Sequence, residues 1–406
     1  MMIRGDCPTE LKMSTCRPRL SRRHAVAQLL GAAALATVGA SPLGRAVAAA
    51  ADEPERLTEL GMPLTAAQRA AGDAFLKHHV SVDVHCHPGR FFLEGLPADT
   101  AAARTLGAPF ADQALEELNA GHVSAAVFAA VADLRVLEVS AQGVRATRDF
   151  APGEAYADYQ RQIAQLKAIL ARDSSGAAFS PEDIRAAARR GRTAAIFGVE
   201  GGDFIEDQPE RVSAAFADGV RVITLVHYHV NQIGDIQTEP PVHQGLTPLG
   251  ADIVRAMNAT GILIDLAHAT LEVTRDVVQI SQVPVMISHT NLVSEAARHP
   301  RLITPEQAKL VTDRGGLIGS VPWGVAQNSF ADYIDSLQRL SAAVGIDHVA
   351  VGTDMDATIR PVLKNYRDWS LLPAALLAKG MHEREVAKIM GENFLRVFGA
   401  VLGHRR

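Results

Sequence analysis

Two histidines spaced one residue apart follow an apolar run in the stretch VDVHCHPG. His85 and His87 flank Cys86 there. Side chains at positions i and i+2 of a strand point to the same face, so the two imidazoles are expected to lie side by side while Cys86 points away. Such a pair can bind a metal ion. A chain with 15 histidines among 406 residues also contains such pairs by chance, so the pair needs partners elsewhere in the sequence.

Those partners stand at the ends of other apolar runs. The residues suited to metal or proton chemistry in these positions are Glu200, His227, His268, His289 and Asp354. Polar residues scattered at random would not keep this position from one run to the next. Because the carboxyl ends of the strands of a barrel meet at one mouth, we expect all of these side chains to gather there.

The chemistry of this group indicates a metal centre. Neutral imidazoles suit zinc and similar divalent cations, and one carboxylate can bridge two of them. We therefore expect His85 and His87 to bind one ion and His268 and His289 to bind a second. Glu200, followed by two glycines that allow a close turn, is the expected bridge. A water molecule between the two ions would then be activated to hydroxide.

Two aspartates precede metal-ligand candidates closely enough to orient them. Asp83 stands shortly before His85, and Asp265 shortly before His268. A carboxylate that accepts a hydrogen bond from a ligand imidazole holds its ring in place. Ordinary capping or core hydrogen bonds are the alternative for both aspartates, and the sequence leaves this choice open.

The elements that position these residues repeat one pattern of an apolar run, a polar turn and an alanine-rich amphipathic stretch. Near-continuous apolar strands that alternate with helices are typical of a parallel sheet covered on both faces. Eight such units predict an α/β fold, a (β/α)8 TIM barrel. Two stretches outside the repeat, a helix over 155–173 and a long loop over 231–248, could cover the active face. The predicted strands begin at Val80, Ser124, Thr193, Arg221, Gly261, Val283, Gly316 and His348.

Composition and the amino terminus restrict the setting. With 48% hydrophobic and 21% charged residues the chain can bury a large core, and a net charge of -5 gives no case for nucleic acid, so a small molecule is the expected partner. Arg22 and Arg23 precede an alanine-rich run that ends in a small-residue site, Ala46-Val47-Ala48. This is typical of a cleaved twin-arginine export signal. We expect residues 1–50 to be that signal and 51–406 to be one barrel domain, exported to the periplasm or outside the cell without a stable membrane anchor.

The chain resembles the renal or membrane dipeptidases, peptidase family M19, within the amidohydrolase-like metal-dependent hydrolases. The resemblance runs over roughly 81–401. Its motifs are GVEGGDF around Glu200, ITLVHYHVN around His227, LIDLAHATLEVT around His268, VPVMISHTN around His289, HPRLITPEQ around Arg301, VAVGTDMD around Asp354 and GENFLRVF near the end. Taken together these motifs are specific, whereas any one alone would be weak.

The resemblance implies an activity and a role for each matching residue. It implies a dipeptidase with two divalent ions, zinc first among them, one bound by His85, His87 and Glu200 and the other by Glu200, His268 and His289. It further implies that His227 binds the substrate and polarises its carbonyl, that Asp354 is the acid and base, and that Arg301 binds the terminal carboxylate. The catalytic residues implied are therefore Asp354, His227 and Glu200.

One ligand position departs from the family pattern. His87 stands where members usually carry an aspartate, so the centre would be more positive by one charge, which favours ionised water and anionic substrates. Two other functions stay open: hydrolysis of another small substrate such as an N-acyl amino acid, a lactone or a phosphoester, and a non-catalytic binding barrel. The sequence also leaves open whether the native metal is zinc, manganese or cobalt, which substrates are cleaved, and whether the chain forms a homodimer.

Overall fold

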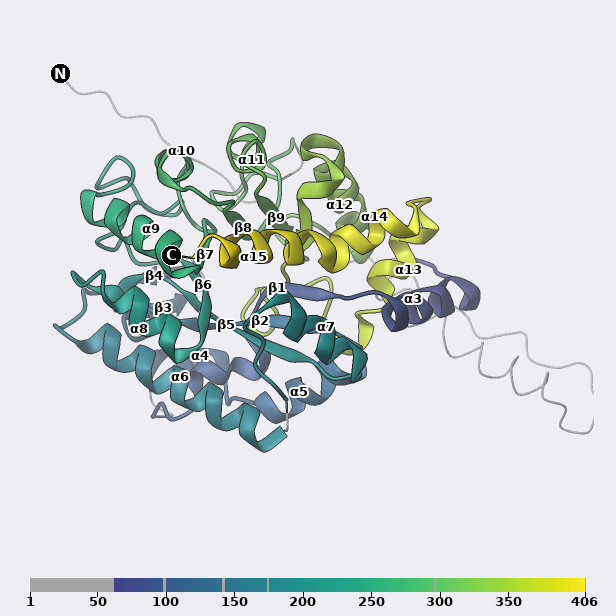
Figure 1. Ribbon diagram of the computed structural model, residues 1–406, viewed down its shortest axis with the longest axis horizontal. Coiled ribbons are helices and arrows are strands. Elements are labelled where there is room, and N and C mark those ends of the chain that lie inside the picture. The colour runs from purple at the N-terminus through teal and green to yellow at the C-terminus, as the bar shows by residue number, and fades with distance from the viewer. Residues whose placement is uncertain (1–61, 98–99, 141–142, 174, 296, 406) are drawn as a thin grey trace, which may run out of the picture. The chain divides into compact units, whose positions relative to one another are not determined.

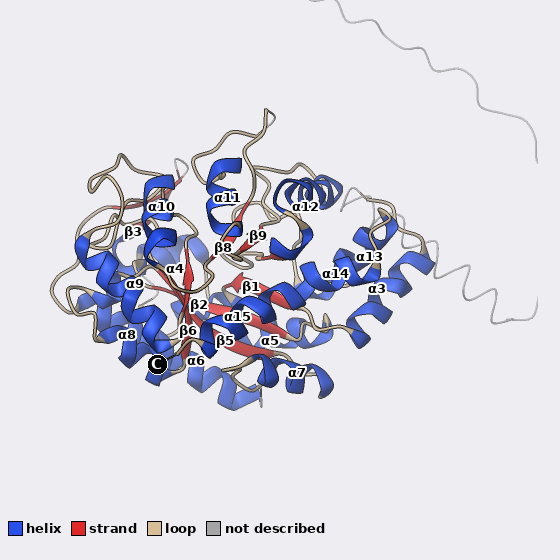
Figure 2. Cartoon of the chain, turned by 45° about the horizontal axis from the view of Figure 1, so that its top comes forward, coloured by secondary structure: helices blue, strands red, loops and turns tan. Residues whose placement is uncertain are grey.

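The barrel predicted from the repeat is the observed fold. The computed structural model describes residues 62–97, 100–140, 143–173, 175–295 and 297–405. Its main sheet is a closed barrel of parallel strands in the order β1-β10-β9-β8-β7-β6-β5-β2. Figure 2 shows these strands at the centre with helices around them. The strands are β1 (Val82–Cys86), β2 (Ala125–Val131), β5 (Ala194–Glu200), β6 (Val220–Thr224), β7 (Leu263–Asp265), β8 (Met286–Thr290), β9 (Leu317–Ser320) and β10 (Val349–Val351).

Helices surround the barrel, and polar caps fix where many of them begin. The side chains of Thr247, Thr304 and Ser180 each accept a backbone N–H of the first turn, and a proline follows each of them. The helices are α3 (Ala66–His78), α4 (Ala101–Leu106), α5 (Ala111–Ala120), α6 (Glu154–Asp173), α7 (Pro181–Arg189), α8 (Arg211–Asp218), α9 (Pro248–Thr260), α10 (Leu271–Ile280), α11 (Pro305–Thr312), α12 (Phe330–Val344), α13 (Leu371–Ala378), α14 (Glu383–Ala387) and α15 (Asn393–Gly403).

The last helix packs on the interior of the barrel. Phe394 and Phe398 of α15 are fully buried in one cluster with Val82 and Val84 of β1 and with Val222 of β6. Figure 1 shows α15 lying across the strands. Because Val82 is the first residue of β1, this helix covers the end of the barrel away from the mouth.

The two stretches outside the repeat have the predicted local structure. The helix predicted over 155–173 is α6, and the segment between β6 and α9 carries neither helix nor named strand. The loop follows the mouth closely, since the backbone N–H of Gln237 donates to the carbonyl of His268. The helix α6 instead flanks the barrel: Gln162 exchanges hydrogen bonds of 2.8 Å with the backbone of Val131, and no residue of α6 lines the cavity at the mouth.

A short hairpin that the repeat did not predict also lies near the mouth. The strands β3 (Leu137–Ser140) and β4 (Gly143–Ala146) pair in antiparallel register outside the barrel. They bring Leu137 and Val144 to the cavity.

The export signal predicted for residues 1–50 lies outside the described residues, as does the start of the predicted barrel domain at residue 51. Within the described part of the chain, no helix has both the length and the apolar character needed to cross a membrane.

Candidate active site

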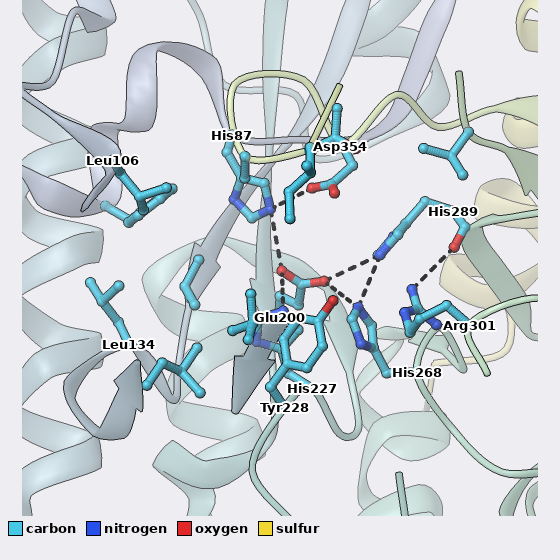
Figure 3. Close-up of a pocket in the computed structure, with 18 of the residues that line it drawn as sticks. His87, Leu106, Leu134, Glu200, His227, Tyr228, His268, His289, Arg301 and Asp354 are labelled. Carbon is cyan, nitrogen blue, oxygen red and sulfur yellow. Dashed lines mark hydrogen bonds and ion pairs between the residues drawn. The ribbon is translucent and has the colours of Figure 1, made fainter. Parts of the chain in front are cut away.

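Glu200 lies at the centre of the mouth with imidazoles on every side. Its Oε1 lies 3.1 Å from Nε2 of His268 and 3.4 Å from Nε2 of both His85 and His289. Its Oε2 lies 3.2 Å from Nε2 of His87 and 3.3 Å from Nε2 of His227. Figure 3 shows this carboxylate between the rings. All the histidines predicted as metal ligands therefore meet at the residue predicted to bridge the ions.

A register shift in β1 directs His85 and the following His87 into the mouth. Val84 points into the barrel, where it packs with residues of the other strands. Simple alternation along β1 would therefore point the next residue, His85, out of the barrel. The pairing of β1 with β2 shifts between Asp83 and Cys86, and such a bulge re-aims the side chains that follow it. The rings of His85 and His87 then converge, with their Nε2 atoms 3.3 Å apart.

Several functional side chains lie beyond the strands that carry them. The strands β6, β7 and β10 end at Thr224, Asp265 and Val351, so His227, His268 and Asp354 stand on the following loops. His268 and Asp354 adopt left-handed backbone conformations, with φ of 67° and 52°. Such conformations cost about 1–3 kcal/mol in non-glycine residues and cluster at functional sites, where the surroundings hold them in place.

The glycines after Glu200 are required by close packing. Gly201 has a φ of 94°, which favours glycine, and a Cβ there would lie 2.8 Å from the carboxylate of Asp203. A Cβ on Gly202 would lie 2.2 Å from Ile233. The turn can therefore pass close to the mouth only because both positions lack a side chain.

The donor set fits divalent metal ions. The Nε2 atoms of His268 and His289 lie 3.1 Å apart, close enough for both to bind one cation. Oε1 of Glu200 is buried and has no hydrogen-bond partner among the described residues, although three imidazole nitrogens lie within 3.4 Å of it. Imidazole nitrogens with one shared carboxylate are the ligands that zinc and similar cations prefer.

Electrostatics keep the two later histidines neutral and the carboxylate ionised. Burial, aided by the positive charge of Arg301, holds the pKa of His268 well below its usual value, and burial does the same for His289. Burial would raise the pKa of Glu200, but the charges of His227 and His85 outweigh it and hold that pKa well below its usual range. A neutral imidazole and an ionised carboxylate are the protonation states that bind metals. At His87 burial would lower the pKa, but the carboxylates of Asp354 and Glu200 outweigh burial and raise that pKa to about 10, so a bound cation would displace a proton there.

The division of ligands between two ions stays a prediction. Three groups have ligand atoms within 4.8 Å of one another, and they overlap: His85 with Glu200 and His289; Glu200 with His227 and His268; His85 with His87 and Asp354. None of them is one of the two predicted sets. The reason is geometric, because every imidazole lies near the same carboxylate, so proximity alone does not divide them.

The remaining ring nitrogens of two candidate ligands have partners that fix their orientation. Nδ1 of His87 lies 2.8 Å from the carbonyl of Ala129, and Nδ1 of His289 lies 2.9 Å from the hydroxyl of Ser288. That hydroxyl donates to Asp265 at 2.6 Å. Asp265 thus acts on His289 through Ser288 rather than on His268. Asp83 accepts from the backbone N–H of His85 and from Thr353, so it holds the strand rather than a ring.

Asp133 is a candidate site residue that the sequence did not point to. Its Oδ1 accepts from Nδ1 of His227 at 2.7 Å, and its Oδ2 accepts the backbone N–H groups of Tyr228 and His229 at 2.9 and 3.0 Å. This carboxylate is fully buried. It orients the His227 ring with Nε2 toward Glu200. Asp133 stands just after the end of β2, so the strand-end rule, applied to that strand too, would have found it.

Replacing Asp133 by Asn is expected to lower kcat about 10–100-fold while metal content stays unchanged. The two carboxylate oxygens of Asp133 accept hydrogen bonds from three donors, whereas the amide of asparagine has only one oxygen. Steady-state kinetics and metal analysis measure this. Asp203→Asn is the matched control, since Asp203 accepts from Nδ1 of His229 at 2.6 Å. An equal loss of kcat in both variants would contradict a special role for Asp133.

Asp354 and Arg301 lie on different sides of the metal-ligand cluster. Oδ1 of Asp354 lies 3.2 Å from Nε2 of His87, and its backbone N–H donates to the carbonyl of His85. Nη1 of Arg301 donates to Gln237 at 2.6 Å, and Nη2 lies 3.4 Å from the carbonyl of His289. Both side chains line one cavity of about 970 Å³, its open mouth included, with Glu200 and His227. A concave site with a few convergent polar groups among apolar walls is typical of small-molecule binding.

The chain is similar in sequence and in fold to known proteins. The dipeptidase verJ of Clonostachys rogersoniana is 28% identical over 299 residues, which cover 71% of this chain and 75% of that protein. An amidohydrolase from Pseudomonas aeruginosa has a similar fold, with a TM-score of 0.65, 23% identity and coverage of 82% of this chain and 99% of that one.

A metallopeptidase from Rhodobacter sphaeroides, solved with a phosphinate mimic of the dipeptide L-Ala-D-Ala, has a TM-score of 0.67 at 20% identity and covers 80% of this chain and 99% of its own. At these identities the two structural matches show the fold alone. The family model of the membrane dipeptidases matches residues 69–405. The chain therefore belongs to the membrane dipeptidase family, peptidase family M19.

Proposed function

We propose that this metal-dependent dipeptidase cleaves dipeptides with two divalent ions, zinc first among them, held by His85, His87, Glu200, His268 and His289. The observation that carries the proposal is the ring of imidazoles around one buried carboxylate at the floor of a small-molecule cavity. When bound, such ions supply an activated water and polarise the carbonyl of the scissile bond. The nitrogen-rich donor set supports zinc.

The chain's own residues supply the remaining steps. Asp354 has a side chain that is 21% exposed and lies beside His87, so it can take a proton from the attacking water and pass it to the departing amine. His227, held by Asp133, presents Nε2 to the cavity and can stabilise the oxygen of the scissile carbonyl. The guanidinium of Arg301 can bind the terminal carboxylate through two parallel hydrogen bonds.

Metal removal tests this function. Protein dialysed against a chelator and then reloaded with zinc is expected to hold two ions per chain and to regain hydrolysis of dipeptides that the dialysed protein has lost. Metal analysis and a dipeptide panel, run on the same preparations, measure both. Zinc-saturated protein with fewer than one ion per chain would contradict the binuclear centre. Protein with two ions that cleaves no dipeptide of the panel would contradict the proposed function.

We also propose that the protein is exported through its twin-arginine segment and that a cleavage near Ala46-Val47-Ala48 removes it. Sequencing the amino terminus of the protein made in its native host tests this. A mature chain that still carries Arg22 and Arg23 would contradict a cleaved signal.

A further inference from the structure

The cavity has an apolar compartment on the His87 side of the metal-ligand cluster. Its walls are Phe92, Leu106, Val131, Leu134, Leu137 and Val144. They come from the end of β2, from segments that follow β1 and β2, and from the β3–β4 hairpin. The ring of Phe92 packs edge to face against the ring of His87, with centroids 5.4 Å apart. This compartment is therefore continuous with the metal-ligand cluster.

The charged end of the cavity lies on the other side of the cluster. Figure 3 shows Leu106 and Leu134 on one side of Glu200 and Arg301 on the other. Arg301 contacts the backbone of His289, whereas the apolar compartment contacts His87. The cavity thus has a cationic end, where Val321 and Trp323 lie near Arg301, a central cluster of metal ligands, and an end whose walls are all apolar.

This polarity fixes how a dipeptide can lie. The terminal carboxylate belongs to the second residue, so binding to Arg301 places that residue at the cationic end. The scissile carbonyl then reaches the metal-ligand cluster near Glu200. The side chain of the first residue is attached on the far side of that carbonyl, and it must extend toward Leu106 and Leu134.

The charges of the compartment define what it accepts. Among the described residues that line the cavity, the ionisable side chains are the histidines, Tyr228, Glu200, Arg301 and Asp354. The ring of Tyr228 packs against the apolar residues, and burial raises the pKa of its phenol, so it brings no charge to the compartment. None of the others is one of its walls. A charged or amide side chain placed there would lose its hydrogen bonds to water without a partner, whereas an aliphatic or aromatic one would gain by leaving water.

We propose that the chain selects dipeptides whose first residue carries a large apolar side chain, and that the apolar compartment is the site that recognises it. This inference rests on the proposed function, because it takes the bound molecule to be a dipeptide whose carboxylate binds Arg301. Leucine and asparagine side chains have nearly the same shape, so they separate polarity from size.

The experiment compares Leu-Ala with Asn-Ala as substrates of the zinc-loaded protein. Leu-Ala is expected to have the higher kcat/KM by about 10–100-fold, the factor that burial of a leucine side chain supplies. Ala-Leu and Ala-Asn form the positional control, and the preference between them is expected to be smaller. An equal or larger preference in this second pair would overturn the assignment of the compartment to the first residue.

Two variants locate the effect. Leu106→Asp and Val144→Asp each place a carboxylate on a half-buried wall of the compartment, and each is expected to lower the ratio of Leu-Ala to Lys-Ala turnover at least about tenfold. Two separate variants are tested so that a folding defect in one of them does not decide the result. Val242→Asp is the matched control, because Val242 is 68% exposed and does not line the cavity, so its ratio should stay that of the unchanged protein.

The outcomes separate this inference from the proposed function. Cleavage of Leu-Ala and Asn-Ala with kcat/KM values within threefold of each other overturns the inference and leaves the dipeptidase standing. A ratio of Leu-Ala to Lys-Ala turnover that neither variant changes also overturns the inference and leaves the dipeptidase standing. If protein with two bound zinc ions cleaves none of these dipeptides, the proposed function fails and the inference fails with it.

Discussion

Replacement of Asp354 by Asn is expected to lower kcat by about 10²–10⁴-fold, the usual contribution of general acid and base catalysis. Asparagine keeps the size of the side chain but cannot accept a proton and deliver it to the leaving amine. The backbone should stay in place, because the N–H of Asp354 donates to the carbonyl of His85 at 2.8 Å whatever the side chain is. Asparagine also tolerates the left-handed conformation at this position better than most residues.

Metal content must be measured in the same preparation. Oδ1 of Asp354 lies 3.2 Å from Nε2 of His87, so a loss of metal could imitate a loss of catalysis. Asp356→Asn is the control, since Asp356 does not line the cavity and accepts the backbone N–H of Gly89 at 2.7 Å. Near-normal turnover by Asp354→Asn on the best substrate would mean that the proton is carried by another group.

Glu200→Gln is expected to have the larger effect on metal binding. It should reduce the content from two ions to less than one per chain and abolish measurable dipeptide hydrolysis. Glutamine preserves the shape of the side chain but removes the negative charge that all the candidate ligand imidazoles approach. Without that charge two divalent cations would lie close together among neutral ligands. Elemental analysis after zinc saturation measures the change.

Single-histidine variants provide the comparison for Glu200. His268→Ala should lose one ion and keep the other, because the resemblance to the dipeptidases assigns His268 to only one site. The bridging role fails if Glu200→Gln retains both ions while His268→Ala loses both. Circular dichroism or thermal unfolding of each variant shows whether the barrel itself is intact.

The barrel could be predicted from the sequence because its signal is local and repeated. Each predicted run overlaps a strand of the observed barrel, and the strand that ends at Glu200, β5, is buried along its whole length. The predicted metal-ligand residues also meet, since parallel strands of one barrel share a carboxyl end. The position of His85, His268 and His289 at the ends of their runs was therefore enough to predict that they lie around one carboxylate.

Local pattern was less reliable at the ends of the strands. His227, His268 and Asp354 were placed on strands but lie on loops, and two of them adopt left-handed backbone conformations. Alternation also did not show the register shift of β1, which re-aims His85 and His87. Hydrogen bonds between strands set these features, and such bonds join segments far apart in the sequence.

By itself the sequence determined the eight-stranded barrel, the residues at its mouth and the family to which the chain belongs. Only the tertiary structure decided that Asp133 orients His227, that Asp265 acts through Ser288, and that an apolar compartment adjoins His87. The physical reason is that strand and helix patterns record which side of an element is buried, whereas a cavity and its polarity depend on which buried sides face one another. The compartment is formed by η1 (Pro88–Leu93), the end of β2, α4, η2 (Leu134–Val136) and the β3–β4 hairpin, and no periodicity in their sequences relates one of these segments to the others.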